Sequence, residues 1–176
     1  MADIKKDLPD WPDDVIEQWL LRLANRADTG WPPPEPFGDH VWKNILGNKP
    51  LSWWRKIRWK LEDHDITFEA LSAASQKIVS EMLAAHINGA RNVYSVWPES
   101  KVRFLSLERY VAQHGTYPKP PVAMRLNDGL RIIDGNHRVT VLCCRQAASK
   151  KVLKSDGVTP IRHHQIWVGS RMNGEL

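Results

Sequence analysis

The stretch from residue 122 to residue 138 constrains the fold more than any other part of the chain. Apolar residues alternate over 122–126, a spacing that predicts a strand with one buried face. Residues 127–129 read Asn-Asp-Gly, a strong turn signal, and residues 130–133 supply an apolar returning strand. A helix is expected from Asn136 onward, packed against this hairpin. Such an order requires a fold that contains both a sheet and helices.

The N-terminal region, residues 1–98, predicts helices rich in tryptophan. Apolar residues recur there at helical spacing, and residues 31–36 contain three successive prolines that predict an extended connector. The predicted helices lie at 13–27, 41–46, 53–62 and 67–87, and another at 106–113 precedes the hairpin. We therefore expect an α+β fold, with a small mixed sheet and its helices in residues 99–176 after an α-helical extension.

The net positive charge of the chain comes from its C-terminal part. The net charge is +5 for the whole chain, −3 for residues 1–100 and +8 for residues 101–176. An excess of Lys and Arg suits a polyanionic partner such as DNA or a nucleotide phosphate, although it also keeps a protein surface soluble. The charge is thus consistent with a nucleotide or DNA as partner. It is equally consistent with a charged surface that only keeps the protein in solution.

Other features of the sequence favour a cytoplasmic protein. No apolar run reaches the length of a membrane span, and residues 1–10 lack the apolar core of a signal peptide. Cys143 and Cys144 are adjacent, a spacing that rarely permits a disulfide, and we expect two small residues buried on a helix.

The candidate site for chemistry is the segment from Asp134 to Arg138, where a strand runs into a helix. The first N–H groups of a helix lack partners inside it, and Gly135 lets an anion approach the backbone closely. Arg138 offers a fork of donors for phosphate oxygens, and His137 can shuttle a proton. Asp134 can orient the histidine, act as a base or hold a divalent cation such as Mg²⁺.

This segment, together with 120–122 and the turn 127–129, resembles the ParB/sulfiredoxin superfamily and its ParB-like nuclease domains over about residues 100–170. The resemblance implies a small fold whose Gly-x-x-Arg turn holds a nucleoside triphosphate. It also implies hydrolysis of ATP or CTP, cleavage of DNA, or reduction of peroxiredoxin sulfinic acids. On this basis Asp134, His137 and Arg138 are the expected catalytic residues, and Gly135, Asn136, His137 and Arg138 the expected phosphate ligands.

Two branches of the superfamily fit poorly. Sulfiredoxins carry a reactive cysteine directly before the His-Arg pair, and Asn136 stands at that position, so the sulfur chemistry has no nucleophile. Chromosome-partitioning members carry Gly-Glu-Arg-Arg and continue into a DNA-reading domain, for which the chain leaves no room after Arg171. Free-standing members remain, including the plasmid fertility-inhibition group with its oncogenic-suppression proteins, which block transfer of DNA by another element.

Several further residues are candidates. Glu108, in the helix before the hairpin, is expected near the phosphate pocket. The segment 52–60 interleaves tryptophans with basic residues, and its Arg55 and Lys56 could contact DNA, or the segment could lie on a membrane surface. The favoured interpretation is packing, with Trp54, Ile57 and Leu61 on one helical face and the basic residues on the solvated side. The cluster of Lys150, Lys151 and Lys154 could likewise reach DNA or form an ordinary turn. His163 and His164 are expected on opposite faces of the last strand.

Two functions follow from these patterns. The first is an enzyme that hydrolyses ATP at the Gly135 turn and, with a divalent cation, cleaves DNA. This enzyme would act as a fertility-inhibition factor that blocks DNA transfer by another element, with a conjugation or secretion-system protein as partner. The alternative is a module of a plasmid or phage that binds DNA, a nucleotide or a protein and does no chemistry.

Overall fold

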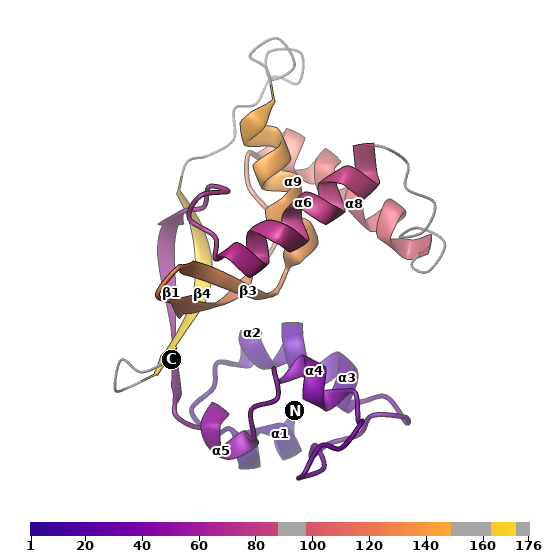
Figure 1. Ribbon diagram of the computed structural model, residues 1–176, viewed down its shortest axis with the longest axis vertical. Coiled ribbons are helices and arrows are strands. Elements are labelled where there is room, and N and C mark those ends of the chain that lie inside the picture. The colour runs from indigo at the N-terminus through magenta and orange to yellow at the C-terminus, as the bar shows by residue number, and fades with distance from the viewer. Residues whose placement is uncertain (88–97, 149–162, 172–176) are drawn as a thin grey trace. The chain divides into compact units, whose positions relative to one another are not determined.

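The computed structural model describes residues 1–87, 98–148 and 163–171, and it confirms the α+β fold (Figure 1). Helices accompany a four-stranded mixed sheet with strand order β1-β4-β2-β3. The chain divides into two compact units. Unit 1 comprises residues 1–60 with 168–176, and unit 2 comprises residues 61–167.

Unit 1 is built from short helices around a cluster of tryptophans. Trp11 lies at the centre, with its ring stacked on Trp19 at 5.6 Å and edge-on to Trp54 at 5.9 Å and Trp59 at 5.1 Å. Its indole nitrogen donates to the Trp54 carbonyl oxygen at 3.2 Å. The helices are α1 (Ala2–Asp7), α2 (Asp13–Val15), the π-helix η1 (Ile16–Leu21), α3 (Arg22–Ala24), α4 (Trp42–Ile45) and α5 (Leu51–Trp54).

The helix predicted at 53–62 is wrong. Helix α5 ends at Trp54, and strand β1 occupies Ile57–Asp65. Ile57 is fully buried while Arg58 is exposed, the alternation of a strand, and Leu61, expected in a helical packing face, is 37% exposed. The apolar residues of this segment fit the spacing of a helix as well as that of a strand. The segment forms a strand because it pairs within the sheet.

The predicted hairpin is confirmed in unit 2. Strand β2 (Val122–Leu126) pairs antiparallel with β3 (Gly129–Asp134), and Leu126 faces Gly129 across the turn. Gly129 has φ of +127°, and a Cβ there would lie 2.8 Å from the carbonyl oxygen of Ala70. This close approach permits two backbone hydrogen bonds between β3 and the segment 70–72, Leu130 N–H to Ala70 and Ser72 N–H to Leu130.

The helices of unit 2 differ from the predictions in their starting points. Helix α6 runs over Ala73–Ile87 and begins six residues later than predicted, because 70–72 instead pair with β3. Helix α8 (Pro98–His114) begins well before Ser106. Helix α9 (Asn136–Ala147) follows β3 as expected, and β4 (His163–Arg171) is the last strand.

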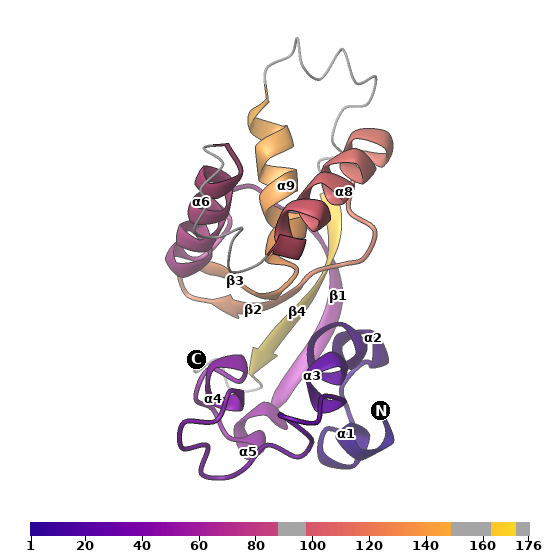
Figure 2. The same cartoon turned by 90° about the vertical axis from the view of Figure 1, so that its right-hand side faces the viewer.

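Helices α6, α8 and α9 lie on one face of β2 and β3 (Figure 2). The buried hydroxyl of Ser75 in α6 accepts a hydrogen bond from the Ile132 N–H of β3 at 2.8 Å. Since α6 also packs against α9, residues 61–87 belong to the same unit as the hairpin. The domain boundary expected between residues 98 and 99 therefore falls inside unit 2.

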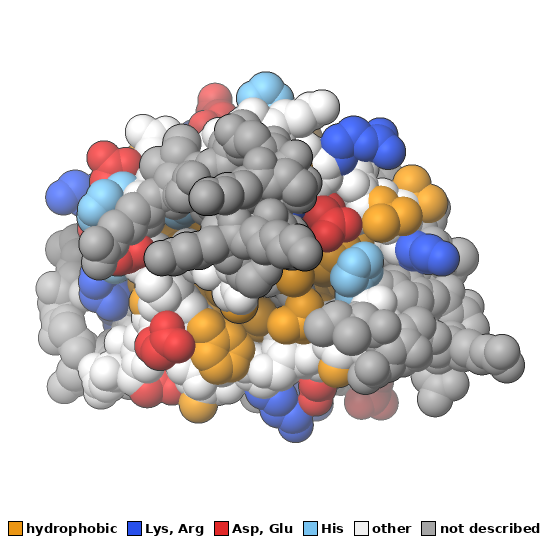
Figure 3. All heavy atoms as spheres, turned by 90° about the horizontal axis from the view of Figure 1, so that it is seen from above, with side chains coloured by type: hydrophobic (Ala, Val, Ile, Leu, Met, Phe, Trp, Pro, Cys, Tyr) orange, Lys and Arg blue, Asp and Glu red, His pale blue; other side chains and the backbone are white. Residues whose placement is uncertain are grey.

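Helix α8 exposes two apolar side chains, Val102 at 70% and Leu105 at 43%, although its Phe104 is buried. The face drawn in Figure 3 shows hydrophobic side chains among charged ones. Cys143 is buried and Cys144 partly buried on α9, and both are free thiols, as expected. Within the described ranges, no helix combines the length and the apolar character needed to cross a membrane.

Candidate functional site

The junction between β3 and α9 has the predicted strand-to-helix geometry. Strand β3 ends at Asp134, Gly135 takes the left-handed conformation with φ of +93°, and α9 begins at Asn136. The first backbone hydrogen bond of the helix runs from the Val139 N–H to the Gly135 carbonyl at 3.0 Å. The N–H groups of the first turn precede that bond, and at a helix start such groups favour an anion.

The guanidinium of Arg138 is engaged inside the protein. Its Nη2 donates to Asp134 Oδ2 at 2.5 Å, and its Nη1 donates to the Lys119 carbonyl oxygen at 3.0 Å. The Arg138 side chain is 13% exposed, whereas that of Asp134 is 32% exposed. Burial lowers the pKa of Arg138, Asp134 opposes that shift, and the group stays charged at neutral pH. Arg138 thus ties β3, α9 and the chain before β2 together.

The same guanidinium occupies the space beside Gly135. A Cβ added at Gly135 would lie 2.8 Å from both Nε and Nη2 of Arg138 and 2.9 Å from Cβ of Pro121. The sequence interpretation, that the missing side chain leaves room for an anion, therefore needs correction. The room that the glycine provides is filled by the arginine of its own helix.

His137 lies half-buried in the first turn of α9, and the pKa of its imidazole falls below the usual value. Burial is the main cause, and the positive charge of Arg103 on α8 adds to it. The ring is consequently neutral near pH 7, with one nitrogen able to accept a proton. Sequence reasoning did not single out Arg103, because its influence on His137 depends on the packing of α8 against α9.

Glu108 lies on α8, and its charge acts on Cys144 of α9. It raises the pKa of Cys144, although burial of that thiol contributes more. Cys144 lies two turns along α9, about 10 Å in helix length from His137. The role of Glu108 at the phosphate pocket stays a prediction.

Asn136 contributes its backbone to the turn. Its carbonyl accepts a hydrogen bond from the Thr140 hydroxyl at 2.8 Å, and its side-chain oxygen is buried without a partner among the described residues. A buried oxygen is out of reach of a ligand in solvent. Phosphate oxygens accept hydrogen bonds, so the groups of Asn136 that could bind phosphate are its backbone N–H and its side-chain NH2.

The donor set around Asp134 does not fit a divalent cation. The Asp134 carboxylate forms an ion pair with Arg138. A metal ion would have to take the place of this guanidinium in order to bind the carboxylate. In the part of the chain that the structure describes, no three His, Cys, Asp or Glu side chains come together as metal ligands. The metal role predicted for Asp134 thus finds no second ligand here.

The residues predicted to contact DNA fall into two groups along the sequence. Lys150, Lys151 and Lys154 lie outside the described residues. In unit 1, Arg55 donates from Nη2 to the Asp7 carboxylate at 3.0 Å and from Nε to the Asp7 carbonyl at 2.7 Å, while Lys56 is exposed. Packing explains the tryptophans of that segment, and the ion pair with Asp7 accounts for Arg55.

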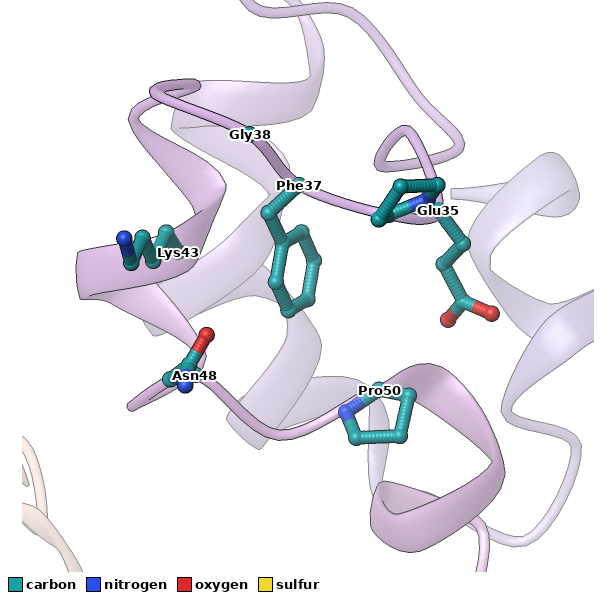
Figure 4. A pocket seen from close by; sticks show the side chains of 7 residues that line it. Glu35, Phe37, Gly38, Lys43, Asn48 and Pro50 are labelled. Carbon is teal, nitrogen blue, oxygen red and sulfur yellow. The ribbon is translucent and has the colours of Figure 1, made fainter.

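A surface hollow of about 450 Å³ lies in unit 1, in a different part of the chain from the turn. The Phe37 ring stands between Lys43 and Asn48 on one side and Glu35 on the other (Figure 4). The Glu35 carboxylate accepts the Leu51 N–H at 2.8 Å and so caps the start of α5. The contacts of Glu35 and the prolines of the hollow serve the local fold of the connector.

Comparison with known proteins gives one distant similarity. No protein-family model and no solved structure matches the chain. The Hsp70 nucleotide exchange factor fes1 of Schizosaccharomyces pombe is 27% identical over 126 residues. That alignment covers 65% of this chain and 43% of fes1, so the chain spans less than half the length of this relative.

Proposed function

We propose that the chain binds the phosphates of a nucleoside triphosphate at the start of α9 and hydrolyses ATP there. The observation that carries this proposal is the left-handed Gly135 turn, which starts α9 at Asn136 and leaves the N–H groups before Val139 outside the helix's own hydrogen bonds, in the same turn as His137, on which the charge of Arg103 acts. A helix start with a nearby cation favours phosphate. The resemblance to ParB-like domains and the basic charge of residues 101–176 point to the same ligand class.

The roles proposed for the side chains follow from their surroundings. Arg103 offsets negative charge on the phosphates, and the neutral imidazole of His137 accepts a proton from the attacking water. Phosphoryl transfer depends mainly on positioning and on stabilisation of charge, which backbone N–H groups and a cation supply. Arg138 holds the turn in shape through its bonds to Asp134 and Lys119.

The resemblance adds two finer parts to the proposal: cleavage of DNA, and action as a fertility-inhibition factor on a conjugation or secretion-system protein. The proposed location is the cytoplasm, which the sequence favours because it has no apolar run of membrane-spanning length. Mg²⁺ would accompany ATP as part of the substrate, and no step is assigned to a metal held by Asp134.

Binding without chemistry is the second candidate, and the engagement of Arg138 favours it. The arginine expected in catalysis has its Nη groups on Asp134 and Lys119, so stabilisation of a transition state would require it to exchange partners. The name of fes1 describes a protein that acts on another protein's nucleotide state. By that analogy, a protein partner is an alternative to a nucleotide substrate for this chain.

The experiment is calorimetric titration of the full chain with ATP, alongside assays of ATP hydrolysis and plasmid nicking. His137→Ala and Arg103→Ala are each expected to weaken ATP binding about tenfold, the scale of one charge-assisted hydrogen bond. Arg109→Ala is the matched control, because Arg109 is an exposed arginine of the same helix that does not act on His137.

A loss of affinity as large in Arg109→Ala as in Arg103→Ala would contradict the site, since it would reflect overall charge only. Saturable ATP binding without any turnover would favour the binding module over the enzyme. Wild-type protein that binds no ATP would contradict both the enzyme and a nucleotide-binding module.

A further inference from the structure

The Asp134–Arg138 pair has an unusual position. The carboxylate comes from the last residue of β3, the guanidinium from the first turn of α9, and the pair at 2.5 Å spans the Gly135 turn between them. A cation in the first turn of a helix is opposed by the helix dipole, so it requires an anion close by. The protein supplies that anion from its own chain.

The two partners are held unequally. Arg138 is 13% exposed and is fixed by a second bond, from Nη1 to the Lys119 carbonyl. Asp134 is 32% exposed, so the anionic side of the pair faces solvent. The carboxylate is therefore in contact with water, while the guanidinium is largely buried and also bonded to the chain before β2. An anion from solvent would reach the pair from its carboxylate side.

A phosphate group is a stronger partner than the carboxylate at such a position. It offers more acceptor oxygens and more negative charge, and it can bind the guanidinium and the N–H groups of a helix start together. An anion arriving at the start of α9 therefore competes with Asp134 for Nη2 of Arg138.

We propose that Asp134 is an internal competitor for the phosphate site: an incoming phosphate displaces its carboxylate from Arg138, which then becomes a phosphate ligand. This inference rests on the proposed function, since it concerns the same helix start. It assigns two states to Arg138, paired with Asp134 in the free protein and bound to phosphate in the complex, with its Nη1 on Lys119 in both.

The test is calorimetric titration of the full chain with pyrophosphate, comparing wild type with Asp134→Asn. Removal of the carboxylate charge is expected to tighten binding about tenfold, because the phosphate no longer displaces an ion-pair partner. Glu62→Gln is the matched control. It removes the same charge from another 2.5 Å ion pair of unit 2, with Arg125, and is expected to leave the affinity near that of wild type.

An affinity of Asp134→Asn equal to or weaker than that of wild type, with wild type binding normally, would overturn the competition and leave the proposed function standing. Equal tightening in Glu62→Gln would also overturn it, as an effect of overall charge. No binding of pyrophosphate or ATP by any of the three proteins would overturn the proposed function and this inference together.

A second measurement serves if Asp134→Asn does not fold. A crystal structure of the wild-type protein grown with pyrophosphate is expected to show Nη2 of Arg138 on a phosphate oxygen and the Asp134 carboxylate turned away. Pyrophosphate bound at the start of α9 beside an intact Asp134–Arg138 pair would overturn the inference.

Discussion

Replacement of Gly135 by alanine is expected to lower the free energy of unfolding by about 3 kcal/mol, the upper range for a side chain forced into left-handed backbone. The φ of +93° is unfavourable for any L-residue. The new methyl group would also meet the Arg138 guanidinium at 2.8 Å and Pro121 at 2.9 Å. Relief of that contact requires Arg138 to leave Asp134, so the variant should lose the shape of the turn as well as stability.

Gly47→Ala is the control for this prediction. Gly47 also has positive φ, +57°, but an added Cβ would meet nothing within 4 Å. Its cost should be about 1 kcal/mol, the conformational part alone. Urea denaturation followed by circular dichroism measures both. Equal costs for the two variants would show that Arg138 does not fill the space beside Gly135.

Trp11→Ala is expected to cost about 4 kcal/mol of stability in unit 1, as deletion of a buried aromatic side chain does. Trp11 is 1% exposed and contacts the rings of Trp19, Trp54 and Trp59. Its removal leaves a cavity between three rings and an unpaired carbonyl at Trp54. Denaturant unfolding followed by tryptophan fluorescence is the measurement.

The matched control is Trp53→Ala. Trp53 is only half-buried, packs edge-on against Trp54 at 4.7 Å and lies under the Lys49 ammonium. Its deletion removes the same side chain from the rim of the cluster and should cost about 1 kcal/mol, since water already covers part of the ring. A cost for Trp11→Ala no greater than that for Trp53→Ala would contradict a core centred on Trp11.

Local turn chemistry made the hairpin and its helix predictable. The Asn-Asp-Gly turn at 127–129 places β2 and β3, and the glycine at 135 marks the change from strand to helix. These signals lie within a few residues of the structure that they specify, so a single sequence carries them. The opposite facings of exposed His163 and buried His164 followed from the strand period in the same way.

Long-range pairing was not predictable. The segment 57–65 fits a helix in its local pattern and becomes a strand because it joins the sheet. The segment 70–72 leaves the predicted helix because its backbone bonds Leu130, sixty residues away in the chain. The action of the Arg103 charge on His137 and of the Glu108 charge on Cys144 depends on how α8 packs on α9, which periodicity on one helix does not specify.

The candidate site was predictable in its location and not in its internal pairing. Asp134 and Arg138 stand four residues apart across the turn, so the sequence shows that they are neighbours. Whether Arg138 turns to solvent or to Asp134 depends on Gly135, Pro121 and the Lys119 carbonyl that enclose it. The phosphate ligand expected from the sequence is, in the free protein, the partner of its own aspartate.

The most direct test of the phosphate site is a titration of the isotope-labelled full chain with ATP, followed through its backbone amide resonances by nuclear magnetic resonance. The amides of Asn136, His137 and Arg138 are expected to show the largest saturable shifts, because their N–H groups would donate to the phosphates. Shifts that leave these three amides unchanged, or that gather in unit 1 around Phe37 and Lys43, would contradict a phosphate site at the start of α9.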